Sequence, residues 1–133
     1  MEAGLRRWHE VVAKRDPSLL TDLLEPDAVF ISPVLHRPVV GRDLVTMYLL
    51  GAMQVLGVGQ DFRYVREVCA GDDAVLEFET LLDGLTVNGV DMIRFNDADR
   101  IVEFKVMLRP LSATMAVKAQ MAALLTGGMT PDS

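Results

Sequence analysis

The sequence predicts an α+β fold in which one curved antiparallel sheet carries its helices on one side. The first observation is a change of period. Apolar residues recur at helical spacing in the N-terminal third, whereas the chain from 61 to 109 alternates as strands do. The second observation is turn chemistry, because segments rich in Gly, Asp and Asn at 71–73, 83–84 and 96–99 separate consecutive strands.

The N-terminal third predicts two helices. Four apolar residues share one face of the first helix: Leu5, Trp8, Val11 and Val12. Asp16 is a favourable N-cap and Pro17 suits the first helical position, so a second helix is expected over 18–24. This helix should end before Pro26, because the residue that precedes a proline resists the helical region.

A short strand, an irregular loop and a third helix follow. Residues 28–31 form a β-branched and aromatic run that predicts a strand. Pro33 and Pro38 bracket a loop that ends at Gly41. The next helix, over 44–55, is apolar nearly all round, which predicts that it is well buried.

Four strands and a last helix complete the chain. The strands are expected over 61–69, 74–82, 86–96 and 100–109, and the helix over 111–125. No internal repeat or linker divides the sequence. Residues 1–126 are therefore expected to form a single domain, and residues 127–133 a flexible tail.

Charge and cysteine content exclude several classes of protein. The formal net charge is -6, so a nucleic-acid partner is not expected. Cys69 is the one cysteine, which allows no intrachain disulfide, and the first ten residues lack the apolar core of a signal peptide. No apolar run reaches the roughly 18 residues of a membrane helix. We therefore expect a cytoplasmic protein with no membrane partner.

Asp91 has the most unusual position in the sequence. Alternation over 86–96 places it on the same strand face as three apolar residues: Val87, Ile93 and Phe95. A carboxylate there is costly unless it is paired, or else its pKa rises and it stays protonated. A protonated carboxyl group can donate a hydrogen bond to a carbonyl or enolate oxygen. The alternatives are an ion pair with Arg94, Arg109 or another arginine, or an edge position at which Asp91 reaches water.

His36 is the second candidate for chemistry. It lies in the loop between Pro33 and Pro38, and the usual pKa of histidine suits acid/base work near neutrality. The alternative is a solvated loop histidine with no role. The sequence has no phosphate-binding loop, no zinc pattern and no serine elbow, and neither a metal nor an organic cofactor is expected.

Three other residues have structural interpretations. Trp8 and Tyr48 lie on apolar helix faces, which is typical of core residues whose polar tips seek a partner. Ser32 follows the first strand directly, which is typical of a turn or cap residue.

Two blocks of sequence resemble the nuclear transport factor 2-like superfamily, and more narrowly its SnoaL-like and ketosteroid isomerase branch. The first block comprises residues 23–33 and 38–43, and the second comprises residues 89–95, 100–103 and 108–111. The resemblance covers almost the whole chain. It implies a cone-shaped, cystatin-like fold, in which a curved antiparallel sheet wraps around the N-terminal helices and a deep apolar pocket opens between them. Because this fold hosts both enzymes and binding proteins, the function has to be argued from the site.

Ketosteroid isomerases use an aspartate base, a tyrosine and a protonated aspartic acid. By the resemblance, the protonated acid falls on Asp91, the base falls on Ser32 and the tyrosine falls near Trp8. A serine cannot replace an aspartate base unaided, and an indole donates a hydrogen bond without shuttling protons. The resemblance therefore implies an isomerase or lyase without the usual aspartate base.

We interpret the chain as a small-molecule enzyme of the SnoaL-like kind. It is expected to act by acid/base chemistry, as an isomerase, cyclase or dehydratase, on an apolar carbonyl compound. Asp91 is expected to stabilise an enol or enolate oxygen, and His36 to accept the proton. The pocket is expected to be lined by Trp8, Phe30, Ser32, Tyr48, Phe78, Phe104 and Leu108. The alternative is a non-catalytic ligand-binding or dimeric accessory module of the same fold.

The outer face of the sheet predicts a homodimer. Val90, Met92 and Met107 are expected on this face among charged residues, and clustered apolar residues on a sheet indicate an interface. The resemblance also implies pairing through the sheet, since members of the superfamily commonly pair in this way. A symmetric dimer is the simplest closed state.

Overall fold

The computed structural model of the protein describes residues 1–57 and 61–128. Within these ranges helices come first and strands dominate the second half, as the change of period predicts. The elements are α1 (Glu2–Lys14), α2 (Pro17–Leu23), β1 (Leu24–Ile31), β2 (Val39–Val40), α3 (Arg42–Gly57), β3 (Arg63–Ala70), β4 (Asp73–Leu82), β5 (Leu85–Phe95), β6 (Ile101–Arg109) and α4 (Leu111–Gly128).

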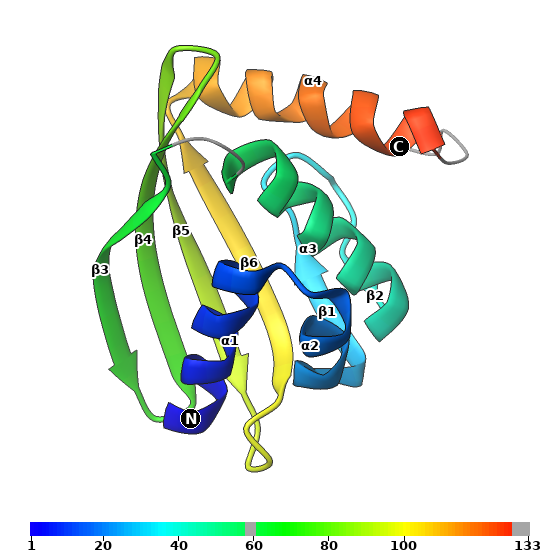
Figure 1. Cartoon of the computed structure of the whole chain (residues 1–133), viewed down its shortest axis with the longest axis vertical. Helices are drawn as coiled ribbons and strands as arrows, with labels where there is room; N and C mark the ends of the chain where they lie inside the picture. The colour runs from blue at the N-terminus through cyan, green and yellow to red at the C-terminus, as the bar shows by residue number, and fades with distance from the viewer. Residues whose placement is uncertain (58–60, 129–133) are drawn as a thin grey trace.

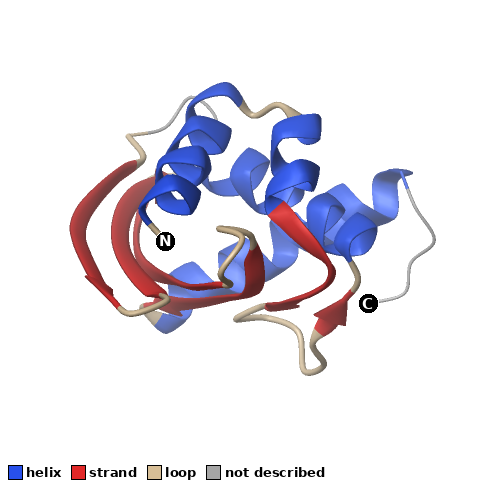
Figure 2. Cartoon of the chain, turned by 90° about the horizontal axis from the view of Figure 1, so that it is seen from below, coloured by secondary structure: helices blue, strands red, loops and turns tan. Residues whose placement is uncertain are grey.

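The strands form one curved sheet in the order β2-β1-β6-β5-β4-β3. Figures 1 and 2 show that this sheet curls without closing, with α1, α2 and α3 on its concave side and α4 across one end. The predicted α+β class is therefore confirmed. The sheet is mixed where the sequence predicts an antiparallel one, because β1 and β6 pair in parallel. The long crossover between these two strands, through α3 and β3–β5, permits the parallel pairing.

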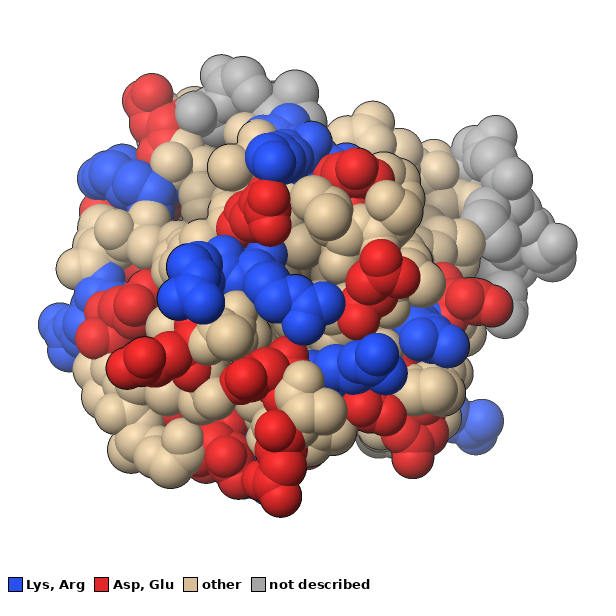
Figure 3. Space-filling view, turned by 60° about the horizontal axis from the view of Figure 1, so that its bottom comes forward, with Lys and Arg blue, Asp and Glu red and all other residues tan. Residues whose placement is uncertain are grey.

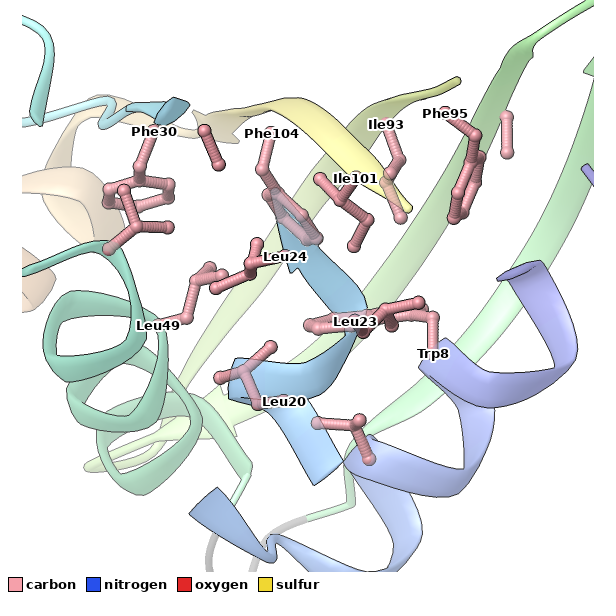
Figure 4. Packing of buried hydrophobic residues seen from close by; sticks show 14 of the residues in the cluster. Trp8, Leu20, Leu23, Leu24, Phe30, Leu49, Ile93, Phe95, Ile101 and Phe104 are labelled. Carbon is pink, nitrogen blue, oxygen red and sulfur yellow. The ribbon is translucent and has the colours of Figure 1, made fainter. Parts of the chain in front are cut away.

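Two apolar clusters hold the helices against the concave face. In the larger cluster, side chains of α1, α2, α3 and β1 meet those of β5 and β6, as Figure 4 shows for Trp8, Leu23 and Phe104. In the smaller cluster, α3 and α4 pack against β4 and β5 around Phe78, Val117 and Met121. Burial of these apolar surfaces is the main favourable term in folding.

Most local predictions are confirmed. Asp16 is the N-cap of α2 and accepts a hydrogen bond from the backbone N–H of Ser18 at 2.9 Å. Burial alternates strictly along β4 and along most of β5, so the predicted inner faces of these strands are correct. Cys69 lies on β3 and is exposed.

Three regions differ most from the predictions. β1 begins at Leu24, which pairs with Ile101, and a register shift then separates this pair from that of Val29 with Glu103. The loop before Gly41 contains the short strand β2, which pairs with β1. α4 continues through Gly128, two residues into the predicted tail, and residues 129–133 lie outside the described part of the chain.

The absence of a side chain at Gly89 allows β5 to lie close to the buried ring of Phe78. A Cβ atom at this position would lie 2.4 Å from the ring of Phe78 and 2.8 Å from Leu108. Both distances are shorter than any normal contact between carbon atoms. Only glycine therefore allows Phe78 to pack directly under the strand that carries Asp91.

Acidic and basic side chains are interspersed on the face that Figure 3 displays. Ion pairs join neighbouring strands, such as Arg94 with Asp73 at 2.9 Å and Arg63 with Glu79 at 2.8 Å. Exposed pairs of this kind contribute about 1 kcal/mol or less to stability. In the described part of the chain, no helix is both long enough and apolar enough to cross a membrane.

Candidate active site

A cavity of about 80 Å³ lies between the two apolar clusters, on the concave side of the sheet. Helices α1, α3 and α4 form one side of it, and β1 and β3–β6, with the segments that flank them, form the other. A cavity of this volume has room for roughly five or more water molecules. Apolar side chains dominate its lining, and the polar exceptions are few: Trp8, Arg15, Ser32, Tyr64 and Asp91. A site of this kind suits an apolar ligand that a few polar groups orient.

Asp91 is the carboxyl group of this cavity. It lies in β5 between Gly89 and Ile93 on the concave face, and it is only 6% exposed. Its Oδ2 atom accepts a hydrogen bond from the hydroxyl group of Tyr64 at 2.7 Å. Among the residues that the structure describes, no protein group hydrogen-bonds the other oxygen, Oδ1. A ligand in the cavity can therefore use Oδ1.

Tyr64 and Trp8 form a chain of hydrogen bonds that ends on Asp91. The indole N–H of Trp8 in α1 donates to the hydroxyl oxygen of Tyr64 in β3 at 3.0 Å. The Tyr64 hydroxyl uses its own proton for Asp91. Aromatic contacts fix the Tyr64 ring, because Phe62 and Phe78 lie edge-on to it with ring centroids 5.2 and 6.3 Å away. The chain holds one side of the Asp91 carboxyl group and leaves the other side for a ligand.

The surroundings of Asp91 shift its acidity toward neutral pH. Burial raises the pKa of Asp91 to about 7, and the hydrogen bond from Tyr64 opposes part of this shift. Burial also raises the pKa of Tyr64 well above its usual value, and the nearby charge of Asp91 adds to the effect. At neutral pH Tyr64 is therefore a neutral donor, whereas Asp91 is divided between its neutral and ionised forms.

The ion pair considered for Asp91 is absent. Arg94 pairs with Asp73 instead, at 2.9 Å. Arg109 is exposed and pairs with Asn88 in the strand register, so its side chain belongs to the opposite face of the sheet. Within residues 1–57 and 61–128, no cation forms a salt bridge with Asp91. The edge position is also wrong, because β5 lies inside the sheet between β4 and β6.

The structure brings six of the seven expected pocket residues together around Asp91: Trp8, Phe30, Ser32, Phe78, Phe104 and Leu108. Tyr48 is outside this lining. Its ring lies beside that of Phe30, with the ring centroids 6.4 Å apart. The residues of α3 that line the cavity include Leu49, Ala52, Met53 and Leu56.

The expectation that His36 shares the cavity with Asp91 is wrong. His36 is exposed and does not line the cavity. The first residues of its loop, from Ser32 to Val34, line the cavity, and the chain then turns outward before β2. His36 therefore cannot accept a proton from a compound bound at Asp91.

Ser32 is a turn residue, as expected, and it also lines the cavity. Its Oγ atom accepts a hydrogen bond from the backbone N–H of Val34 at 3.1 Å. A hydroxyl group has one proton to donate as well, and this bond does not use it. Ser32 is therefore a possible second polar contact for a ligand.

Sequence reasoning missed Tyr64 as a site residue. The signal was present, because Phe62 directly precedes β3 and Tyr64 is its second residue, so the two occupy alternate positions, and the other residues of β3 are exposed. Two aromatic residues on one face of an edge strand indicate that something covers that face. The partner could not be read from the sequence, since Tyr64 is 27 residues from Asp91 and 56 from Trp8.

A metal site is not evident in the described part of the chain, where no three His, Cys, Asp or Glu side chains lie close enough together to hold an ion. Arg15 is the basic residue of the cavity lining. The chemistry available there is thus hydrogen bonding, proton transfer at Asp91 and charge recognition at Arg15.

Comparison with protein families identifies the relatives of this cavity-bearing fold. The model of the SnoaL-like domain matches residues 5–104, which include Trp8, Tyr64 and Asp91. The chain belongs to the SnoaL-like family. It is thereby a member of the nuclear transport factor 2-like superfamily, as the sequence resemblance implied. No curated protein matches this SnoaL-like chain significantly.

Solved structures resemble this SnoaL-like protein over most of its length. A steroid delta-isomerase from Pseudomonas aeruginosa has 41% sequence identity and a TM-score of 0.89, with 95% of this chain and 91% of that chain covered. An uncharacterized protein with a cystatin-like fold from Silicibacter pomeroyi DSS-3 has 35% identity and a TM-score of 0.88, with 96% and 89% covered. A nuclear transport factor 2-like protein of unknown function from Mesorhizobium loti has 25% identity and a TM-score of 0.70, with 82% and 90% covered.

Proposed function

We propose that this SnoaL-like protein is an enzyme that binds an apolar carbonyl compound in its cavity and transfers a proton on it through Asp91. One observation carries the proposal. A buried carboxyl group with a pKa of about 7 faces an apolar cavity, and Tyr64 and Trp8 fix its orientation. A group that titrates near the working pH is the most effective acid or base, because it can both take and return a proton.

The composition of the cavity makes Asp91 the base. The guanidinium group of Arg15 has hydrogen-bond donors but no acceptor, and Tyr64 stays neutral because its pKa is raised. Neither residue can accept a proton from a ligand. In the cavity lining that the structure describes, Asp91 is the one carboxyl group, and no histidine accompanies it. This assignment gives Asp91 the role of proton acceptor that was expected of His36.

The proposed step conserves atoms and charge. The free Oδ1 of ionised Asp91 removes a proton from the carbon next to the carbonyl group. The electrons of that C–H bond move to the carbonyl oxygen, so an enolate forms as Asp91 becomes neutral. Asp91 then returns the proton to another carbon, which isomerises the compound. Where the enolate carbon instead bonds to a second carbonyl carbon of the same compound and closes a ring, the C=O electron pair moves to that carbonyl oxygen, and the resulting alkoxide takes the proton. The hydroxyl group of Ser32 is a donor for the enolate oxygen.

The comparisons support this class of reaction. The protein from P. aeruginosa that is 41% identical to this chain is named a steroid delta-isomerase, a name for an enzyme that moves a double bond. Relocating a double bond next to a carbonyl group requires removal of a proton from one carbon and its return to another. One carboxyl group with access to both carbons can do this.

The test is a proton-transfer assay on β,γ-unsaturated cyclic ketones, from a single ring to a steroid. Formation of the conjugated ketone is followed by its absorbance, and exchange with solvent deuterium is followed by NMR. We expect the wild-type rate to rise with pH and to level off above about 7. Asp91→Asn should lower the rate by about 100-fold or more, since it removes the base. Asp73→Asn, which changes an exposed aspartate outside the cavity, is the matched control.

Tyr64→Phe provides a second, independent arm of the assay. It removes the hydrogen bond that lowers the pKa of Asp91, so the rise in rate should move to higher pH. A wild-type rate in Asp91→Asn, or a rate that falls as pH rises through 7, would contradict Asp91 as the base. Binding of the ketones by the wild type without any exchange would instead establish the non-catalytic binding module.

A further inference from the structure

Arg15 places a positive charge at the opening of the cavity. It is an exposed residue that also lines the cavity, which locates its side chain where the cavity meets solvent. Gly57, at the end of α3, lines the cavity beside it. The inner part of the cavity holds Asp91, so the two charged groups occupy different regions of one apolar space.

A backbone hydrogen bond and a side-chain hydrogen bond hold Arg15 in this position. Arg15 is the C-cap of α1 and adopts a left-handed conformation, with φ 55° and ψ 34°. Its backbone N–H donates to the carbonyl oxygen of Val11 at 2.6 Å, which closes the last turn of the helix. Its side-chain Nη2 donates to the carbonyl oxygen of Gly57 at 2.8 Å. The guanidinium group thus bridges the ends of α1 and α3.

Among the residues that the structure describes, this structural role leaves most of the guanidinium group free. A guanidinium group has five N–H donors, and the bond to Gly57 uses one of them. The partner is a neutral carbonyl group. Nowhere in residues 1–57 and 61–128 does a carboxylate form an ion pair with Arg15, although seven acidic side chains pair elsewhere. A cation with a planar fork of unused donors at the edge of a cavity is suited to bind a carboxylate.

We propose that the ligand of this cavity carries a carboxylate group at the end opposite to its reacting carbonyl group, and that Arg15 binds this carboxylate. The position of the reacting end rests on the proposed function of Asp91. The carboxylate is expected at the opening for two reasons. Arg15 attracts it there, where it keeps part of its hydration, and the ionised form of Asp91 repels it from the inner end.

Helix α1 gives a scale for the separation of the two ends. Trp8, which holds Tyr64 against Asp91, precedes Arg15, the C-cap of α1, by seven residues. At the helical rise of 1.5 Å per residue, the two backbone positions are about 10 Å apart along the axis. The ligand class is therefore an apolar keto acid that is long enough to reach from Asp91 to the opening of the cavity.

A matched pair of fluorescent probes tests this inference. The probes are 6-acetyl-2-naphthoic acid and its neutral amide, 6-acetyl-2-naphthamide, which share one apolar body and one ketone. Dissociation constants are measured at about pH 6, where Asp91 is mainly neutral and the probe acid is ionised. We expect the wild type to bind the acid about fivefold more tightly than the amide, and added salt to reduce this preference.

Variants at residue 15 separate charge recognition from folding. Arg15→Gln should remove the preference for the acid and leave the affinity for the amide unchanged, whereas Arg15→Lys should keep part of the preference. Arg15→Gly removes the side chain in a backbone conformation that glycine adopts readily, so it should fold and give the same result as Arg15→Gln. Lys14→Gln is the control, because it removes an equal charge from a residue that pairs with Glu10 and does not line the cavity.

The outcomes distinguish this inference from the proposed function. Equal affinity of the wild type for both probes, or an equal loss of both in Arg15→Gln, would overturn the carboxylate site. Asp91→Asn should keep the preference for the acid while it abolishes proton exchange. If exchange does not depend on Asp91 but the preference still depends on Arg15, the proposed function fails and the carboxylate site stands.

Discussion

Asp91 shows how one residue can be costly for folding and useful for chemistry. Burial raises its pKa to about 7, so at neutral pH the folded protein contains a partly ionised carboxyl group in apolar surroundings. The single hydrogen bond from Tyr64 offsets only part of the lost hydration. The same surroundings give the group its ability to exchange a proton near pH 7. Perturbed groups of this kind are frequent at functional sites.

Asp91→Asn should change how stability depends on pH. The folded pKa of Asp91 is raised above the unfolded value of about 4, so its favourable contribution is complete below pH 4 and is lost as pH rises through 7. Asparagine has the same shape and does not ionise. Relative to Asp91→Asn, the wild type should lose up to about 4 kcal/mol of unfolding free energy between pH 4 and pH 8.

Chemical denaturation of both proteins at several pH values measures this difference. The comparison cancels the titration of all other groups, because they are the same in the two proteins. A variant that becomes less stable than the wild type as pH rises would show that Asp91 is a stabilised anion. The description of Asp91 as a buried group with a raised pKa would then be wrong.

Strands β4 and β5 show how local packing supports the site. Phe78 of β4 lines the cavity and stacks with Phe62, with ring centroids 5.1 Å apart. Its ring lies directly under Gly89 of β5, where no side chain fits. The same strand carries Asp91 two residues later, on the same face. The absence of a Cβ atom at position 89 therefore sets how closely the aromatic rings of the cavity approach the strand that carries Asp91.

Gly89→Ala should destabilise the fold by about 1–3 kcal/mol, since Phe78 is buried and cannot move away from a Cβ atom 2.4 Å distant. Gly51→Ala is the contrasting variant. Its Cβ atom would lie 3.5 Å from Met121 and Leu124, which is a normal contact, and alanine favours a helix over glycine by about 1 kcal/mol. Denaturant midpoints should therefore move in opposite directions for the two variants. A neutral or stabilising Gly89→Ala would mean that the floor of the cavity is loosely packed.

The outer face of the sheet carries exposed apolar side chains that no helix covers. Val90 lies opposite Met107, and Met92 lies opposite Val75, so an apolar band crosses β4, β5 and β6. Met107 is 51% exposed, and the helices cover only the other face of the sheet. An exposed apolar band on a sheet is typical of an interface, and the same band on a second copy would be self-complementary.

We predict a homodimer that forms through this band. Light scattering coupled to size exclusion should give twice the chain mass at micromolar concentration. The double variant Met92→Lys, Met107→Lys should shift the protein toward the monomer, because it replaces apolar area with charge. Met115→Lys is the control, since Met115 is a similarly exposed methionine on α4, away from the sheet. A wild-type monomer, or an unchanged mass in the double variant, would contradict the prediction.

The sequence by itself determined the elements and the direction of individual side chains. Strand alternation placed Asp91 among apolar residues, and the Asp16-Pro17 pair marked the start of α2. The sequence blocks also indicated the SnoaL-like family. These features depend on short-range physics: backbone geometry repeats every 2 or 3.6 residues, and a cap acts on its own helix.

Only the tertiary structure decided which of these side chains meet. It joined Trp8, Tyr64 and Asp91 in one chain of hydrogen bonds, placed Arg15 at the cavity opening and left His36 in solvent. It also paired β1 with β6 in parallel, which no local signal indicated. The physical reason is that periodicity fixes the face on which a side chain lies, whereas the packing of distant elements fixes what that face contacts. The raised pKa of Asp91 depends on those contacts, and so it is a property of the fold.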